Sequence, residues 1–220
     1  MTKQKFRAVI FDLDGTLLDT LQDLGAGANM ALRRFGFPEH TMEEYKHFIG
    51  NGIPKLIARA VPPGTDEETT RQVLAFYLDY YPAHCTEHTR FFPGVPETIA
   101  ALARRGYTLG VLSNKTETTT KRIIAHYFPE GTFQVVWGNN GVRPLKPATD
   151  AGYLLLDELS CRPEEIFYVG DGDTDMAFAS RMGFFAAGAA WGYRPCDVLL
   201  ENGADALFEG MADILPYLSE

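Results

Sequence analysis

The sequence has few cysteines and no excess of basic residues. The three cysteines lie far apart and are odd in number, so they form neither a disulfide framework nor a paired-cysteine zinc motif. This usage is typical of a reducing compartment, and we expect a cytoplasmic protein. Lys and Arg total 20 against 29 Asp and Glu, a net charge of −9. That balance argues against nucleic-acid partners and anionic membrane surfaces, which need a cationic excess.

Long apolar runs are also missing. No stretch approaches the roughly 20 apolar residues of a membrane span, so we expect no membrane association. Hydrophobic residues make up 45% and aromatic residues 12% of the 220 residues, which excludes a disordered chain. The length exceeds the roughly 150 residues of an ordinary domain. It predicts either one large domain or one domain with an insertion.

Short apolar runs alternate with helical patterns. Unbroken runs of this kind predict strands that are buried on both faces. The runs lie at 8–11, 107–112, 133–136 and 166–169, with weaker ones at 184–187 and 206–208. The helical patterns lie at 98–105, 115–127, 148–159 and 173–182. This alternation predicts an α/β fold, a Rossmann-like parallel sheet with helices on both faces. Ligands bind such sheets at the carboxyl ends of the strands.

Residues 17–83 interrupt the alternation with helical patterns alone, at about 18–35, 42–49, 53–60 and 66–81. Thr41 with Glu44 and Thr65 with Glu68 have the spacing of capping boxes at two helix starts. We therefore predict a helical cap domain at 17–83, inserted after the first strand. The catalytic core would then comprise 1–16 and 84–220.

Two carboxylates, Asp12 and Asp14, follow the first predicted strand directly. Their spacing lets both point into one site, where one attacks as a nucleophile and the other transfers protons. Their mutual repulsion favours a nearby cation. The alternatives are a solvated acidic turn and a calcium loop, but the spacing of acids and Gly15 does not fit an EF-hand.

A second acidic group, Gly170-Asp171-Gly172-Asp173-Thr174-Asp175, follows another predicted strand. Asp171, Asp173 and Asp175 match the first three acidic positions of a calcium loop. Met176 and Met182 stand where that loop requires glycine and glutamate, so the calcium alternative fails. Oxygen ligands from two strand ends suit Mg²⁺ better.

Three further segments supply polar groups. Ser113 and Asn114 follow a strand, where a hydroxyl and backbone N–H groups can hold a phosphoryl oxygen. Lys146 precedes Pro147 and is a candidate for balancing negative charge. The predicted cap loop Gly50-Asn51-Gly52 is either an ordinary turn or a substrate-reading loop. Lys55, just beyond it, is available for a second anionic group.

Taken in order, these motifs resemble the four motifs of the haloacid dehalogenase superfamily of phosphatases, and the helical insertion resembles its first type of cap. Within the superfamily the chain most resembles the phosphoglycolate phosphatases. The resemblance rests on the run from Asp12 to Thr20, on Ile49-Gly50-Asn51-Gly52, on Phe92-Pro93-Gly94-Val95 and on Ser113-Asn114-Lys115.

The resemblance implies a Mg²⁺-dependent phosphatase for a small phosphorylated metabolite, 2-phosphoglycolate being the first candidate. Asp12 would form an aspartyl-phosphate, and Asp14 would act as acid and then base. Ser113 and Lys146 would complete the catalytic set. The implied metal-site residues are Asp12, Asp14, Asp171 and Asp175. Asp14 would offer its backbone carbonyl, and Asp175 would support Lys146 or a metal-bound water. The predicted substrate-binding residues are Thr16, Asn114, Gly50, Asn51, Gly52 and Lys55.

Other functions stay open at this point. A pyrophosphatase, a sugar-phosphate phosphatase and a phosphosugar mutase share the same fold. A phospho-accepting signalling domain also places acidic residues and a lysine at strand ends, although it needs no lid. The oligomeric state is left as monomer or homodimer.

Overall fold

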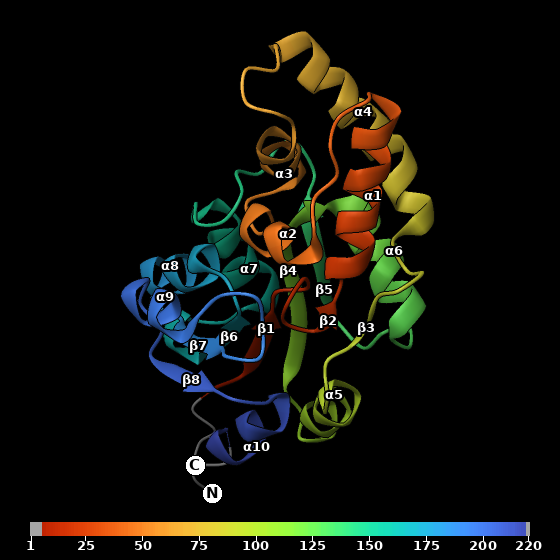
Figure 1. The fold of residues 1–220 in the computed structure, drawn as a ribbon. Helices are drawn as coiled ribbons and strands as arrows, with labels where there is room; N and C mark the ends of the chain where they lie inside the picture. The colour runs from red at the N-terminus through yellow and green to blue at the C-terminus, as the bar shows by residue number, and fades with distance from the viewer. Residues whose placement is uncertain (1–5, 219–220) are drawn as a thin grey trace, which may run out of the picture.

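The computed structural model describes residues 6–218; residues 1–5 and 219–220, which belong to the predicted core, lie outside the described residues. One parallel sheet of six strands forms the centre of the molecule (Figure 1). Its strands are β1 (Ala8–Phe11), β4 (Thr108–Thr116), β5 (Val135–Asn139), β6 (Ile166–Gly170), β7 (Phe185–Ala189) and β8 (Ala206–Phe208). The predicted α/β fold is therefore confirmed.

The strand order, β5-β4-β1-β6-β7-β8, places β1 between β4 and β6. The chain adds β4 and β5 on one side of β1 and then crosses to the other side with β6. In open sheets of this kind, the crevice beyond such a switch in direction is the ordinary ligand site. We therefore expect the functional site at the carboxyl ends of β1 and β6.

Helices cover both faces of the sheet. Alternate residues of β1 point to opposite sides: Val9 and Phe11 belong to one buried cluster, Ala8 and Ile10 to the other. The first cluster includes α5 (Val95–Arg104), α6 (Glu117–Tyr127) and α10 (Ile214–Tyr217). The second includes α7 (Asp150–Leu159), α8 (Asp173–Met182) and α9 (Cys196–Glu201). This two-sided burial explains why the strand sequences are apolar without alternation.

Four helices lie beyond the carboxyl ends of β1 and β4 (Figure 1). They are α1 (Leu21–Arg34), α2 (Met42–Phe48), α3 (Ile53–Ala60) and α4 (Glu67–His84). They pack on one another, with α1 against α2 and α4, and α3 against α4. Tyr45 of α2 and Tyr77 of α4 are fully buried among them. In the described part of the chain, no helix is both long and apolar enough to cross a membrane.

The start of this helical segment differs from the prediction. Leu18–Asp19, expected to be helical, form strand β2, which pairs antiparallel with β3 (Arg90–Phe91). The ion pair of Asp19 with Arg90, at 3.0 Å, adds to the pairing. The chain thus leaves for α1 and returns from α4 at neighbouring points. A two-residue strand has too little periodicity to be seen without its partner.

Helix starts were predicted with mixed success. The capping box of Thr41 and Glu44 is confirmed: the Thr41 hydroxyl accepts from Glu44 N, and Glu44 accepts from Thr41 N. The box predicted for Thr65 is wrong, because Asp66 caps α4 by accepting a hydrogen bond from Thr69 N at 2.8 Å. Asp is as good an N-cap as Thr, and the start therefore shifts by one residue.

Strand β4 is longer than predicted. It continues to Thr116 because β5 extends to Asn139 and pairs with that residue after a register shift. The segment from Ser113 to Lys115, expected in a loop, therefore belongs to the extended end of β4, and α6 begins at Glu117. Polar residues on a strand end are read as a loop when the partner strand is not known.

Candidate active site

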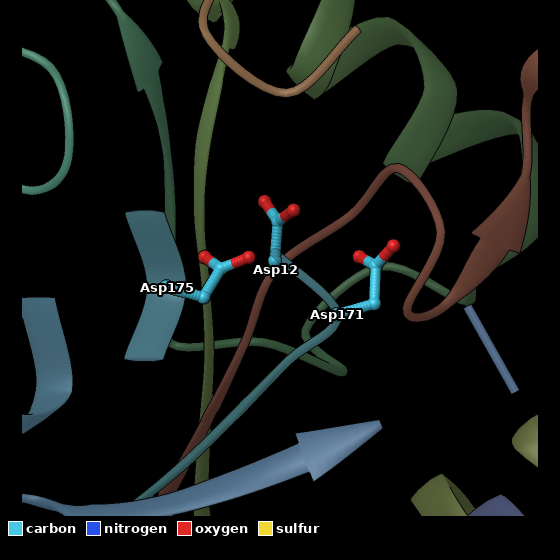
Figure 2. Close-up of side chains that lie close together, drawn as sticks. All are labelled: Asp12, Asp171 and Asp175. Atoms are coloured by element: carbon cyan, nitrogen blue, oxygen red, sulfur yellow. The ribbon is translucent and has the colours of Figure 1, made fainter. Parts of the chain in front are cut away.

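Three carboxylates meet at the switch point of the sheet. Asp12 follows β1, Asp171 follows β6, and Asp175 lies in the first turn of α8. Oxygen atoms of the three side chains lie within 4.8 Å of one another. In Figure 2, Asp12 stands between Asp175 and Asp171, and all three carboxylates point the same way. The parallel sheet thus brings together acids that are about 160 positions apart in the sequence.

Burial changes the acidity of this cluster. Burial raises the pKa of Asp12 from 3.8 to about 7; it outweighs the opposing charge of Lys146, and the charges of Asp175 and Asp14 add smaller contributions. Burial and then the charges of Asp12 and Asp175 raise the pKa of Asp171 to about 8. The raised pKa values show that Lys146 alone does not supply enough positive charge for the buried carboxylates. A divalent cation would supply it, and oxygen donors of this type fit Mg²⁺.

Asp171 is held firmly in place. Its Oδ1 accepts a hydrogen bond from the Thr16 hydroxyl at 3.0 Å, and its Oδ2 accepts one from Tyr193 N at 2.8 Å. The backbone also packs closely around it: a Cβ added to Gly15 or Gly192 would lie within 2.2 Å of Asp171 atoms. Gly15 also has φ +84°, a conformation that favours glycine. This cradle fixes where the carboxylate can point.

Lys146 is the central cation of the site. Its side chain is 2% exposed, and Nζ donates to Asp12 Oδ1 at 3.0 Å and to Asp175 Oδ1 at 2.6 Å. Nζ also lies at hydrogen-bonding distance from the Leu112 carbonyl and the Tyr168 hydroxyl. Burial opposes the charge of Lys146, but the two carboxylates outweigh it and raise its pKa. The lysine therefore stays charged beside Asp12.

Asp175 is occupied on both oxygens. Oδ1 accepts from Lys146 and from the Tyr168 hydroxyl at 3.0 Å, while Oδ2 accepts from Gly172 N at 3.0 Å. The last contact closes the first turn of α8. Of the two roles predicted for Asp175, this geometry corresponds to the support of Lys146.

Asp14 lies next to this cluster with a partly open carboxylate. The Thr20 hydroxyl donates to Asp14 Oδ1 at 2.6 Å, and Lys115 Nζ lies 2.9 Å from the same oxygen. The Asp14 side chain is 18% exposed. Because both contacts involve one oxygen, Oδ2 can exchange a proton with a bound molecule.

The second predicted motif provides both a free hydroxyl and a structural amide. Ser113 is buried, and its Oγ accepts a hydrogen bond from Lys115 N at 3.2 Å, so its hydroxyl proton can still be donated. Asn114 accepts from Lys146 N at 2.9 Å and donates to the carbonyls of Lys146 and Gly50. Asn114 thereby ties the Lys146 segment to the loop between α2 and α3.

A cavity opens above these residues. Gly50 and Gly52 line it, as do the apolar side chains of Leu24, Ile49, Ile53 and Leu56. Asn51 instead accepts a hydrogen bond from Arg59 at 2.7 Å. Lys55 is exposed and is not among the described residues that line the cavity.

Sequence reasoning missed five residues that organise the site: Thr20, Lys115, Tyr168, Tyr193 and Arg194. A lone lysine or arginine normally reads as a solvated charge, and a tyrosine in an apolar run reads as core. One signal was available for Tyr193 and Arg194: they follow β7, and the ends of parallel strands share one edge.

Comparison with known proteins gives one family. The family model described as haloacid dehalogenase-like hydrolase matches residues 9–189. The chain is 30% identical to a phosphoglycolate phosphatase of Haemophilus influenzae, with 97% of this chain and 99% of the relative covered. It is 31% identical to a phosphoglycolate phosphatase of Pseudomonas putida, covering 94% of this chain and 80% of the relative.

Solved structures agree with this result. The crystal structure of a predicted phosphoglycolate phosphatase from Haemophilus somnus superposes with a TM-score of 0.91 at 28% identity, over 99% of both chains. CbbY from Rhodobacter sphaeroides, solved in complex with phosphate, superposes with a TM-score of 0.81 at 22% identity, over 98% and 100% of the chains. At 22% identity, the similarity to CbbY shows a shared fold alone.

Proposed function

Because the chain belongs to the haloacid dehalogenase-like hydrolases, we propose that it is a Mg²⁺-dependent phosphatase that acts through an aspartyl-phosphate. Its substrate is a small phosphomonoester, and 2-phosphoglycolate is the first candidate, in keeping with the curated relatives. The observation that carries the proposal is the pairing of Asp12 with a buried lysine, beside a second carboxylate, Asp14, that is free to transfer protons.

In the first step, Asp12 attacks phosphorus and the ester P–O bond breaks. Lys146, already in contact with Asp12, orients the carboxylate and offers positive charge to the phosphoryl group. The Ser113 hydroxyl donates to a phosphoryl oxygen. Asp14 gives its proton to the departing alkoxide oxygen. Phosphoryl transfer depends mainly on such positioning and charge neutralisation.

In the second step, Asp14, now a carboxylate, takes a proton from water as the water oxygen attacks the phosphorus of the aspartyl-phosphate. The bond between phosphorus and the Asp12 oxygen breaks, and inorganic phosphate and the Asp12 carboxylate are released. Asp12, the Asp14 backbone carbonyl and Asp171 are the groups that would hold Mg²⁺. When bound, the ion supplies positive charge to the phosphoryl oxygens.

We also propose that residues 17–83 act as a cap over this site. Helices α1–α4 pack on one another, and Ile49, Ile53 and Leu56 from this segment line the cavity. An apolar cover excludes water and strengthens the charge interactions beneath it. The paired strands β2 and β3, where the segment leaves and rejoins the core, are the expected hinge.

The test is phosphate release from 2-phosphoglycolate, pyrophosphate and sugar phosphates, with Mg²⁺ and with EDTA. We expect Mg²⁺-dependent turnover of 2-phosphoglycolate and no turnover by Asp12→Asn. Asp157→Asn, an exposed change on α7, is the matched control and should keep wild-type rates. Turnover by Asp12→Asn at the wild-type rate would falsify the mechanism. Faster hydrolysis of pyrophosphate or a sugar phosphate would show that this compound, and not 2-phosphoglycolate, is the preferred substrate. Stable phosphorylation without turnover would favour a signalling domain.

A further inference from the structure

Three cationic side chains line the cavity among the described residues: Lys115, Lys146 and Arg194. Lys146 and Arg194 both donate hydrogen bonds to other residues of the protein. Lys146 has four partners, as described above. Arg194 donates through its guanidinium to the carbonyls of Lys46 and Ile49, and Nε lies 3.7 Å from Asp173 Oδ1. Two of the five guanidinium N–H groups of Arg194 thus hold it against the end of α2.

Lys115 is different. Its side chain is only 1% exposed, and apart from the ion pair with Asp14 its Nζ has no hydrogen-bond acceptor among the described residues. It has one charged neighbour, Asp14 Oδ1 at 2.9 Å, and it lies over the ring of Tyr81 at 4.9 Å from the centroid. An ammonium group has three donors. Leaving such donors unpaired in a buried place is costly unless a ligand takes them.

The position of Lys115 relative to the reaction indicates which ligand group that is. In the proposed mechanism Asp14 contacts the leaving oxygen, and Lys115 is adjacent to Asp14. Lys146 contacts the nucleophile Asp12 instead. Lys115 therefore lies on the leaving-group side of the site, where the apolar residues Leu24, Ile53 and Leu56 line the rest of the cavity. In such surroundings a charge pair is much stronger than in water.

We propose that Lys115 is the specificity-determining residue that binds a carboxylate on the leaving group of the substrate. This inference rests on the proposed phosphatase function and narrows its substrates to phosphomonoesters with a second anionic group close to the ester oxygen. The sequence pointed to Lys55 for this role. Lys115 is buried at the cavity, whereas Lys55 is exposed and outside its lining.

The test compares 2-phosphoglycolate with ethyl phosphate, which has a methyl group where phosphoglycolate has its carboxylate. The readout is the ratio of the two kcat/KM values, measured with Mg²⁺. We expect Lys115→Met to lower this ratio by about 10- to 150-fold, the range for loss of one hydrogen bond to a charged group. Lys115→Arg keeps the charge and should restore part of the ratio.

The controls separate recognition from folding. Lys121→Met removes a 56% exposed lysine from α6 and should leave the ratio at the wild-type value. Thermal unfolding of each variant reports on folding, and the ratio is unaffected by the fraction of protein that is active. Lys55→Met tests whether Lys55, rather than Lys115, binds the carboxylate of the substrate.

An unchanged ratio in Lys115→Met, a loss in Lys55→Met instead, or equal use of both esters by the wild-type protein would each overturn the proposal. A wild-type protein that hydrolyses neither ester would instead contradict the proposed function itself. The wild-type measurement thus distinguishes a failure of the proposed role of Lys115 from a failure of the proposed phosphatase function.

Discussion

Replacing Lys146 by methionine should destabilise the protein strongly, and the structure sets the size of the effect. Methionine keeps most of the side-chain volume but removes the ammonium that joins Asp12 to Asp175. Both carboxylates are buried and lose their shared cation. Breaking a buried ion pair by removing one partner costs about 3–5 kcal/mol. For a chain of this length that corresponds to a fall in Tm of roughly 6–20 °C.

The assay is thermal unfolding in EDTA at pH 5 and pH 8. Because the uncompensated carboxylates are harder to accommodate when ionised, the loss should be larger at pH 8. Lys121→Met removes an exposed pair with Glu117 and should change the free energy of unfolding by no more than about 0.5 kcal/mol. If Lys146→Met lowers Tm no more than this control, or equally at both pH values, the charge argument is refuted.

Three other perturbations follow from the same contacts. In EDTA, the folded protein should lose stability as pH rises from about 4 to 8, because the raised pKa values of Asp12 and Asp171 mean that the folded state binds protons that the unfolded chain releases. Mg²⁺ should therefore raise Tm more at pH 8 than at pH 5. An increase in Tm by Mg²⁺ that is the same at both pH values in thermal unfolding would contradict this. Arg194→Gln removes the guanidinium that donates to the carbonyls of Lys46 and Ile49, so hydrogen exchange in α2 and α3, measured by mass spectrometry, should accelerate at least about tenfold. Unchanged exchange in these helices would show that the two hydrogen bonds do not restrain the proposed cap. Tyr77→Phe removes a buried hydroxyl that has no partner among the described residues, and Tm should stay the same or rise by the equivalent of up to about 1 kcal/mol; a clear fall in Tm would point to an unseen partner.

The sheet and its functional edge were predictable because their signals are local. The apolar runs at 8–11 and 166–169 are strands in which every residue is buried, and an aspartate follows each strand directly. Once the strands are parallel, their carboxyl ends share one edge, so Asp12 and Asp171 come together.

What the sequence left hidden depends on partners from distant segments. Strand β2 exists only because β3 returns beside it, and the end of β4 is extended only because β5 is long enough to pair with Thr116. The sequence does not distinguish Lys115 from Lys55. Only the packing of the chain shows that Lys115 is buried at the cavity and Lys55 is exposed. Burial of a charge is a tertiary property that composition and spacing do not encode.

The pairing of β2 with β3 has an architectural consequence. Asp19 and Arg90 are direct partners in an antiparallel ladder, so the chain between them begins and ends at nearly one point in space. A two-residue turn is enough to join such strands. The helical segment is therefore inserted at a single place, and a segment of different length could join β2 to β3 without altering the path of any strand in the main sheet. If the segment acts as the proposed cap, changes in it can alter the substrate range while Asp12 and Asp171 keep their places at the ends of β1 and β6.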